Sequence, residues 1–196
     1  RMENSKEIDW IGSYSAGYRR IDFEEANGFD ESFPKASGED PELSYKLSKM
    51  GKKLVFNPKA IVYHTHPDSI YKYLKVKFER AFYRVNLYSK HTDKIVKDSY
   101  TTPWIKFQIV AGYAGFVLFL VSIPLISVGQ LALGAGALGL SGIIGTLGLL
   151  STLQFTKFAL KKDLSVALAS LIIIPLRTIA FQIGLVLGTI KYKVLK

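Results

Sequence analysis

The sequence contains no cysteine, which excludes disulfides and thiolate metal sites, and nothing indicates an oxidising compartment. Charge is missing from a long internal stretch, because residues 107–156 carry no acidic or basic side chain. An apolar tract of this length is typical of membrane-spanning helices. Residues 1–6 lack the apolar core of a secretory signal, so we expect the membrane segments to supply their own insertion information.

The charges that are present gather in the first half of the chain, and they are mostly positive. Residues 1–106 hold 15 of the 16 acidic residues and 19 of the 26 basic ones. Within 69–106, directly before the apolar tract, nine lysines and arginines accompany three acids. This placement predicts an anionic membrane surface or phosphorylated substrates as partners, and it argues against nucleic acid. We therefore expect a soluble, cytoplasmic part followed by a membrane part.

Short elements are predicted in residues 1–68. Extended runs at 53–56 and 61–64, and a mixed aromatic and β-branched segment at 8–20, favour strands. Apolar side chains at positions i, i+4 and i+7 predict a helix over 41–50.

The next region, 69–106, is basic and amphipathic. From 69 to about 91, apolar residues recur every three or four positions while lysines and arginines occupy the other faces, which predicts a helix. Two placements are open for this helix. It can lie at the membrane interface, or it can pack on the core of the soluble part.

The membrane region, 107–196, is too long for one crossing. We predict three spans over about 107–128, 131–153 and 164–190, with a tight turn near Gly129. The lysines between the second and third spans then share a side with the basic region 69–106, as the positive-inside rule requires for a multi-pass protein of the cell membrane.

Two features inside the spans invite an interpretation. Glycines recur at every third position from 136 to 148, and they are expected to let neighbouring helices approach closely. Arg177 is costly in hydrocarbon, so it should face other helices or meet an anionic group such as a lipid-linked phosphate.

An ordered series of short motifs runs through residues 8–90, and it resembles the acceptor half of family-2 glycosyltransferases. The motifs in chain order are Arg19-Arg20, Gly28-Phe29-Asp30-Glu31, Gly38-Glu39-Asp40, Gly51, Asn57-Pro58 and Val62-Tyr63-His64. The resemblance implies an α/β fold, namely the C-terminal, acceptor-side part of a GT-A-type domain, followed by an amphipathic helix at the membrane interface and about three transmembrane helices. The tryptophan motif of processive family members is missing, which argues against polymer synthesis.

The resemblance implies that Asp40 is the general base, because inverting transfer needs one carboxylate to take the proton of the attacking hydroxyl. Glu39 is a second candidate, either as the base or as a group that positions the acceptor. A structural alternative exists for Asp40, since an aspartate before proline at a helix start is a common N-cap.

Acidic and histidine residues form the next set of candidates. Asp30 and Glu31 can contact acceptor hydroxyls, or they can be exposed acids of a turn. The resemblance implies that His64 lines the donor pocket, and together with His66 it can contribute to a metal site or meet a diphosphate.

A pair of arginines completes the candidate site. Arg80 and Arg84 lie one helical turn apart with Lys77 nearby, and guanidinium groups donate paired hydrogen bonds to diphosphate oxygens. The alternative is that they bind lipid headgroups.

The predicted activity is a hexosyltransferase-like transfer, with inversion, from a nucleotide sugar to a glycan, polysaccharide or lipid-linked acceptor. The resemblance also implies a divalent cation, Mg²⁺ or Mn²⁺, with ligands mostly in a nucleotide-binding half that would precede residue 8. No Asp-x-Asp motif occurs in the sequence, so the chain alone is expected to be inactive. The rival hypothesis is a non-catalytic membrane scaffold or interaction module.

Overall fold

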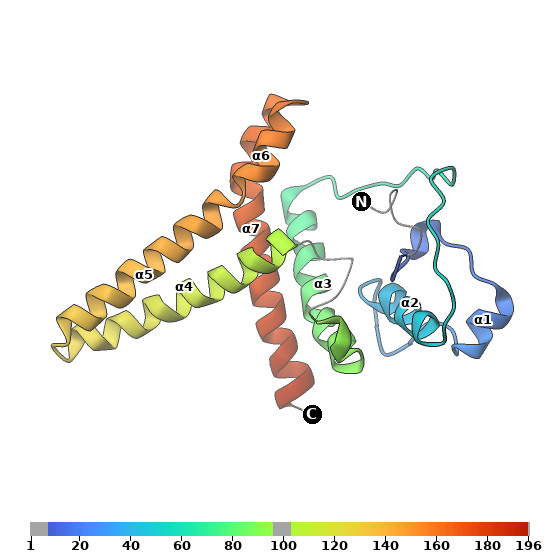
Figure 1. Ribbon diagram of the computed structural model, residues 1–196, viewed down its shortest axis with the longest axis horizontal. Coiled ribbons are helices and arrows are strands. Elements are labelled where there is room, and N and C mark those ends of the chain that lie inside the picture. Colours follow the sequence, from blue (N-terminus) through green and yellow to red (C-terminus); the bar gives the residue numbers. More distant parts are fainter. Residues whose placement is uncertain (1–7, 96–102, 196) are drawn as a thin grey trace. The chain divides into compact units, whose positions relative to one another are not determined.

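The structure is a computed structural model that describes residues 8–95 and 103–195 (Figure 1). The chain divides into two compact units. Unit 1 comprises Arg1–Thr101 together with Gly184–Lys196, and unit 2 comprises Thr102–Ile183. The last turns of the third predicted span therefore belong with the soluble part of the chain.

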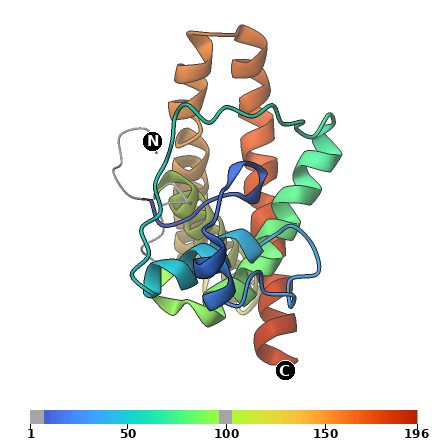
Figure 2. The same cartoon turned by 90° about the vertical axis from the view of Figure 1, so that its right-hand side faces the viewer.

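Unit 1 is built from helices and irregular segments. Its helical elements are η1 (Ser13–Ser15), α1 (Arg20–Glu25), α2 (Glu39–Lys49), α3 (Ile70–Lys90), η2 (Thr92–Lys94) and η3 (Ile190–Val194). Figure 2 shows a long connection without regular structure between the end of α2 and the start of α3.

The predicted α/β GT-A-type fold is wrong for the part of the chain that the structure describes. Residues 8–95 and 103–195 contain no strand, and their only β contact is a single antiparallel bridge in which Ile8 N donates to Leu54 O over 3.0 Å. The runs at 53–56 and 61–64 are irregular, and 61–66 is exposed. A strand needs neighbours to pair its backbone groups, and these segments find none beyond the bridge.

Helix α2 confirms the helix predicted over 41–50, and it is the centre of unit 1. One face buries Leu43 and Leu47 against Ala26 and Leu54. Another face places Tyr45, which is 1% exposed, in a second cluster with buried residues from the loop before α2 and from α3. Burial on both sides fixes the start of α2, which carries the candidate acids.

Helix α3 confirms the amphipathic basic helix. Ser69 caps its start by accepting a hydrogen bond from Lys72 N at 3.3 Å. Leu87 is 2% exposed and packs in the same cluster as Phe33 and Tyr45. Of the two open placements, packing on the soluble core is what the structure shows. The predicted region 69–106 continues into 96–102, which lies outside the described residues.

The other side of α3 receives the end of α7 (Leu164–Thr189). A Cβ atom placed on Gly184 would lie 2.5 Å from Phe78 O, and one on Gly188 would lie 2.4 Å from Phe82 O. The two helices therefore touch backbone to backbone, which only glycine permits.

Unit 2 contains the first two predicted spans and most of the third. Its helices are α4 (Pro103–Ser127), α5 (Leu131–Leu150), α6 (Leu153–Leu160) and the first part of α7. Pro103–Ser127, Leu131–Leu160 and Leu164–Val194 are each long and apolar enough to cross a membrane. Helices α4 and α5 form a hairpin that turns at Gly129, whose φ is +82° (Figure 1). The chain is thus a membrane protein by the length and composition of its helices.

The glycine repeat of α5 does not make the close contacts that we predicted. A Cβ atom on Gly136, Gly139, Gly142 or Gly145 would meet nothing within 4 Å among the described residues. Close packing in the hairpin occurs instead at Gly134, where a Cβ would lie 2.5 Å from Ile126 Cγ1. A repeat of three residues turns 300° per step, so these glycines drift around the helix and cannot line one interface.

Candidate functional site

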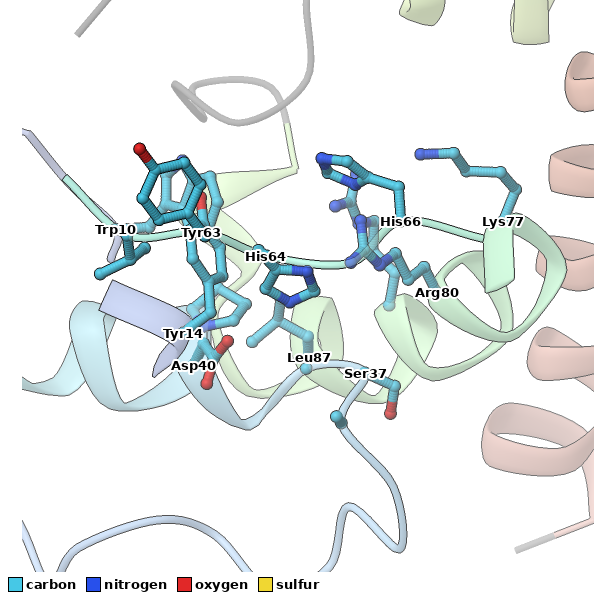
Figure 3. A pocket seen from close by; sticks show the side chains of 15 residues that line it. Trp10, Tyr14, Ser37, Asp40, Tyr63, His64, His66, Lys77, Arg80 and Leu87 are labelled. Atoms are coloured by element: carbon cyan, nitrogen blue, oxygen red, sulfur yellow. The ribbon is translucent and has the colours of Figure 1, made fainter. Parts of the chain in front are cut away.

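A cavity of about 670 Å³ lies in unit 1, and it gathers four of the predicted site residues: Asp40, His64, Arg80 and Arg84. Its walls come from the N-terminal segment, the start of α2, the connection after α2, and α3. In Figure 3, Asp40 lies beside Tyr14 at one end, while His66 and Arg80 lie toward the other. Residues from 10 to 87 are thus brought to one hollow by tertiary packing.

Asp40 provides the carboxylate of this cavity. Its Oδ2 atom accepts a hydrogen bond from Ser13 N at 3.0 Å, whereas the buried Oδ1 atom has no hydrogen-bond partner among the described residues. Burial raises the pKa of Asp40; the bond from Ser13 opposes this, and the nearby charge of Glu39 adds to it. The N-cap of α2 is Gly38, without a side-chain cap, so the N-cap alternative for Asp40 is wrong.

Glu39 has a different task from its neighbour. Its Oε2 atom accepts hydrogen bonds from the backbone N–H groups of Ser37 at 2.8 Å and Gly38 at 3.0 Å. These bonds stabilise the turn into α2, and Glu39 is not among the residues that line the cavity. Of the two acids, Asp40 is the one that faces the hollow.

The two histidines lie in the same cavity as the carboxylate and the cations. The rings of His64 and His66 stack with a centroid distance of 5.6 Å, and Tyr14 meets His64 edge-on at 5.4 Å. A ring nitrogen of His64, Nδ1, lies 2.6 Å from Thr65 O. Both histidines are exposed and line the cavity, so both are placed to meet a ligand there.

Three cations of α3 form the other end of the cavity. Lys77, Arg80 and Arg84 lie at positions i, i+3 and i+7, so they share one side of the helix. Arg84 is only 8% exposed, and its guanidinium lies 5.8 Å from the centre of the Tyr88 ring. A cluster of this kind suits the oxygens of a phosphate or diphosphate.

Aromatic side chains line the same hollow, and none of them was predicted as a site residue. Trp10, Tyr14 and Tyr63 all belong to the lining. Trp10 and Tyr63 are 53 positions apart in irregular segments, where no periodicity connects them. Lys77, which the sequence placed near Arg80 and Arg84, joins them in the lining.

Asp30 and Glu31 are not brought to the cavity. Asp30 pairs with Lys90 Nζ and accepts a bond from Ser32 N at 2.9 Å. Burial acts to raise the pKa of Asp30, but the hydrogen bonds from Lys90 and Ser32 outweigh it and lower this pKa to about 2. Glu31 is exposed in the turn. The structure thus gives Asp30 a stabilising role and leaves Glu31 at the surface.

The described residues do not fit the divalent cation that the resemblance implies. No three histidine, aspartate or glutamate side chains in this part of the chain are grouped closely enough to hold a metal ion. Within the cavity, Asp40 supplies a carboxylate, and His64 and His66 supply imidazoles near the cations. No reaction step is therefore assigned to a metal ion.

A second polar cluster was missed by the sequence analysis. Glu42 is 2% exposed and His91 is 4% exposed, with 3.4 Å between Glu42 Oε1 and His91 Nε2. Lys46 Nζ lies 3.0 Å from Glu42 Oε2. The contact between Glu42 and His91 joins α2 to the end of α3. Neither residue lines the cavity.

Comparison of the chain with protein-family models, with curated proteins and with solved structures found no match.

Proposed function

We propose that the unit 1 cavity is the acceptor side of a sugar-transfer site in a membrane glycosyltransferase. The observation that carries the proposal is the arrangement of one cavity, with the Asp40 carboxylate at one end and Lys77, Arg80 and Arg84 at the other. An inverting transfer needs both groups at once. A base must take a proton from the acceptor, and positive charge must receive the leaving diphosphate.

In this reaction Asp40 takes the proton of an acceptor hydroxyl as its oxygen forms a bond to the anomeric carbon of the donor sugar. The bond between that carbon and the phosphate oxygen breaks at the same time, and the electron pair leaves with the nucleoside diphosphate. Burial supports this role, because it raises the pKa of Asp40 and makes its carboxylate a stronger base.

The other walls of the cavity fit the substrates of such a transfer. Trp10, Tyr14 and Tyr63 offer apolar ring faces with polar edges, which suit the two-sided surface of a sugar. Lys77, Arg80 and Arg84 suit the diphosphate of a nucleotide sugar, or the phosphate of a lipid-linked acceptor.

The membrane helices support a site that works beside the bilayer. The basic residues of α3 support a position for unit 1 at the cytoplasmic face of the cell membrane. The acceptor is then a glycan, a polysaccharide or a lipid-linked sugar that is assembled at this face. A divalent cation, if the reaction uses one, takes its ligands from outside the described residues.

Binding at the cation end can be measured on this chain with inorganic pyrophosphate. The two tryptophans are Trp10 and Trp104, so a Trp104→Phe background leaves Trp10, which lines the cavity, as the reporter. We expect a saturable change in Trp10 fluorescence, and a loss of affinity of about tenfold or more in Arg80→Gln. Arg20→Gln is the matched control, because the Arg20 side chain is 89% exposed outside the cavity.

A non-catalytic scaffold predicts no change in Trp10 fluorescence with pyrophosphate, or an equal loss of affinity in Arg80→Gln and Arg20→Gln. Either result would contradict the proposal. Catalysis is tested in the active enzyme by transfer of labelled sugar to membrane acceptors. Asp40→Asn should lower turnover by about 10²- to 10⁴-fold, and Glu39→Gln by less than about tenfold. Near-normal turnover in Asp40→Asn would exclude Asp40 as the base.

A further inference from the structure

The unit 1 cavity holds two imidazole rings, and the proposed transfer gives neither of them a role. His64 and His66 both line the cavity and are exposed, and their rings stack with 5.6 Å between the ring centroids. The connection that carries them has no regular structure. Tyr14 meets the His64 ring edge-on at 5.4 Å, and this contact holds the pair beside the hollow.

One contact of His64 decides which of its ring nitrogens carries hydrogen. The Nδ1 atom lies 2.6 Å from Thr65 O, and a carbonyl oxygen can only accept a hydrogen bond, so Nδ1 is the donor. In the neutral ring the other nitrogen, Nε2, then has a bare lone pair. The described residues give Nε2 no hydrogen-bond partner. His64 therefore repels an anionic oxygen at Nε2 when the ring is neutral, and it can donate to that oxygen once Nε2 takes up a proton.

The charges around the two rings are mostly fixed. The three cations of α3 stay charged between about pH 5 and 8, whereas histidine is the side chain that ordinarily changes its charge in this range. Among the described residues, Asp40 is the only carboxylate in the lining, and in Figure 3 it lies at the opposite end from His66 and Arg80. Apart from the two histidines, the lining residues that can carry a charge are Tyr14, Asp40, Tyr63, Lys77, Arg80 and Arg84.

We propose that His64 and His66 bind the diphosphate end of the substrate in their charged form, so that anion binding in the cavity takes up a proton. This role rests on the proposed function, because it adds a pH-dependent part to the site formed by Lys77, Arg80 and Arg84. Two charges on stacked rings repel each other, so we expect the pair to take up about one proton. Uptake of one proton raises the affinity by up to about tenfold for each unit by which the pH falls.

The experiment measures anion binding by the full chain in a neutral detergent, with methanedisulfonate as the probe. Its two sulfonate groups flank one carbon, much as two phosphoryl groups flank the bridging oxygen of a diphosphate. Unlike pyrophosphate, it keeps the same charge across this pH range, so a change of affinity must come from the protein. EDTA is present throughout, so that no metal ion can link the histidines to the probe.

Trp10 is the reporter, in a background that carries Trp104→Phe and Asp40→Asn. Asp40→Asn removes the other lining group that can titrate in this range, since burial raises the pKa of Asp40. We expect saturable binding with an affinity at least about tenfold higher at about pH 5.5 than at about pH 8. Calorimetry in two buffers of different ionisation heat should show uptake of about one proton per bound anion near pH 6.5.

Two variants separate a binding role from a structural one. The double variant His64→Gln/His66→Gln should bind the probe within about threefold of the background protein at about pH 8, and it should lose the increase at about pH 5.5. A merely structural role would lower the affinity equally at both pH values. His91→Gln is the matched control, because His91 is the third histidine of the chain and lies outside the lining, and it should keep the increase.

The possible failures are distinguishable. An affinity that does not depend on pH, or binding without proton uptake, would disprove the role of the histidines; the proposed function would stand if pyrophosphate still binds and Arg80→Gln still weakens it. Loss of the increase in His91→Gln as well would trace the effect to the fold and also disprove the role. If His91→Gln fails to fold, the full increase in the double variant is by itself the contradicting result. Binding of neither anion would overturn both proposals.

Discussion

The contact between α3 and the end of α7 leads to the sharpest prediction about stability. Gly184-Leu-Val-Leu-Gly188 is a pair of glycines four residues apart, and both face the backbone of α3. We predict that Gly184→Ala and Gly188→Ala each destabilise unit 1, although alanine is the better helix former.

The magnitude follows from the geometry. An alanine Cβ at 188 would lie 2.4 Å from Phe82 O and 3.0 Å from Val85 Cγ2, against an ordinary contact of at least 3.4 Å. Backbone atoms cannot turn away as a flexible side chain can, so the helices must separate by about 1 Å. Such overpacking costs about 1–3 kcal/mol. The gain from helix propensity is about 1 kcal/mol, which leaves a net loss of up to about 2 kcal/mol for each variant.

The assay is reversible unfolding of the protein in detergent, with circular dichroism as the signal that monitors unfolding. Gly139→Ala is the matched control, because a Cβ there meets nothing within 4 Å, and it should be neutral or stabilising by up to about 1 kcal/mol. The result that would refute the reasoning is a loss in Gly139→Ala equal to that in Gly184→Ala and Gly188→Ala. The close approach of α3 and α7 would then not exist in the folded protein.

Two further predictions concern carboxylates of unit 1, and both are measured by denaturant unfolding over a range of pH. Asp30 has its pKa lowered to about 2, so its contribution to stability is present above its unfolded value of 3.8 and is lost as the pH falls through 2. Asp30→Asn should therefore lower the free energy of unfolding by about 1–2 kcal/mol at pH 7. This difference between the variant and the original protein should shrink below pH 4. An equal difference at all pH values would contradict the ion pair with Lys90. Asp40 has its pKa raised by burial, so the folded state favours its neutral form and is destabilised once Asp40 ionises. Asp40→Asn should thus increase stability at pH 7 and leave it unchanged below pH 3.8, and a loss of stability at pH 7 would show that Asp40 is structural.

Several elements were predictable because their signals are local. The α2 and α3 helices follow from apolar spacing along one face, and the spans follow from long stretches without charge. The turn of the hairpin at Gly129 follows from the break between two apolar runs, and its positive φ explains the glycine.

Tertiary structure decided everything that depends on partners far away in sequence. The segments at 53–56 and 61–64 have strand-like composition, but composition cannot supply the neighbouring strand that a sheet needs. The regular glycine repeat of α5 predicts a packing face. The close contacts with the backbone of α3 are instead made by Gly184 and Gly188, a single pair that no repeat marks in the sequence.

The cavity shows the same division between local and distant information. The sequence by itself determined which residue types were available, namely an acid at a helix start, two histidines and a row of cations on one helix. Only packing decided that Asp40 faces the hollow while Glu39 holds the turn, and that Asp30 pairs with Lys90 instead. The physical reason is that side-chain chemistry is a property of the residue, whereas burial and proximity arise when segments some 70 residues apart fold onto each other.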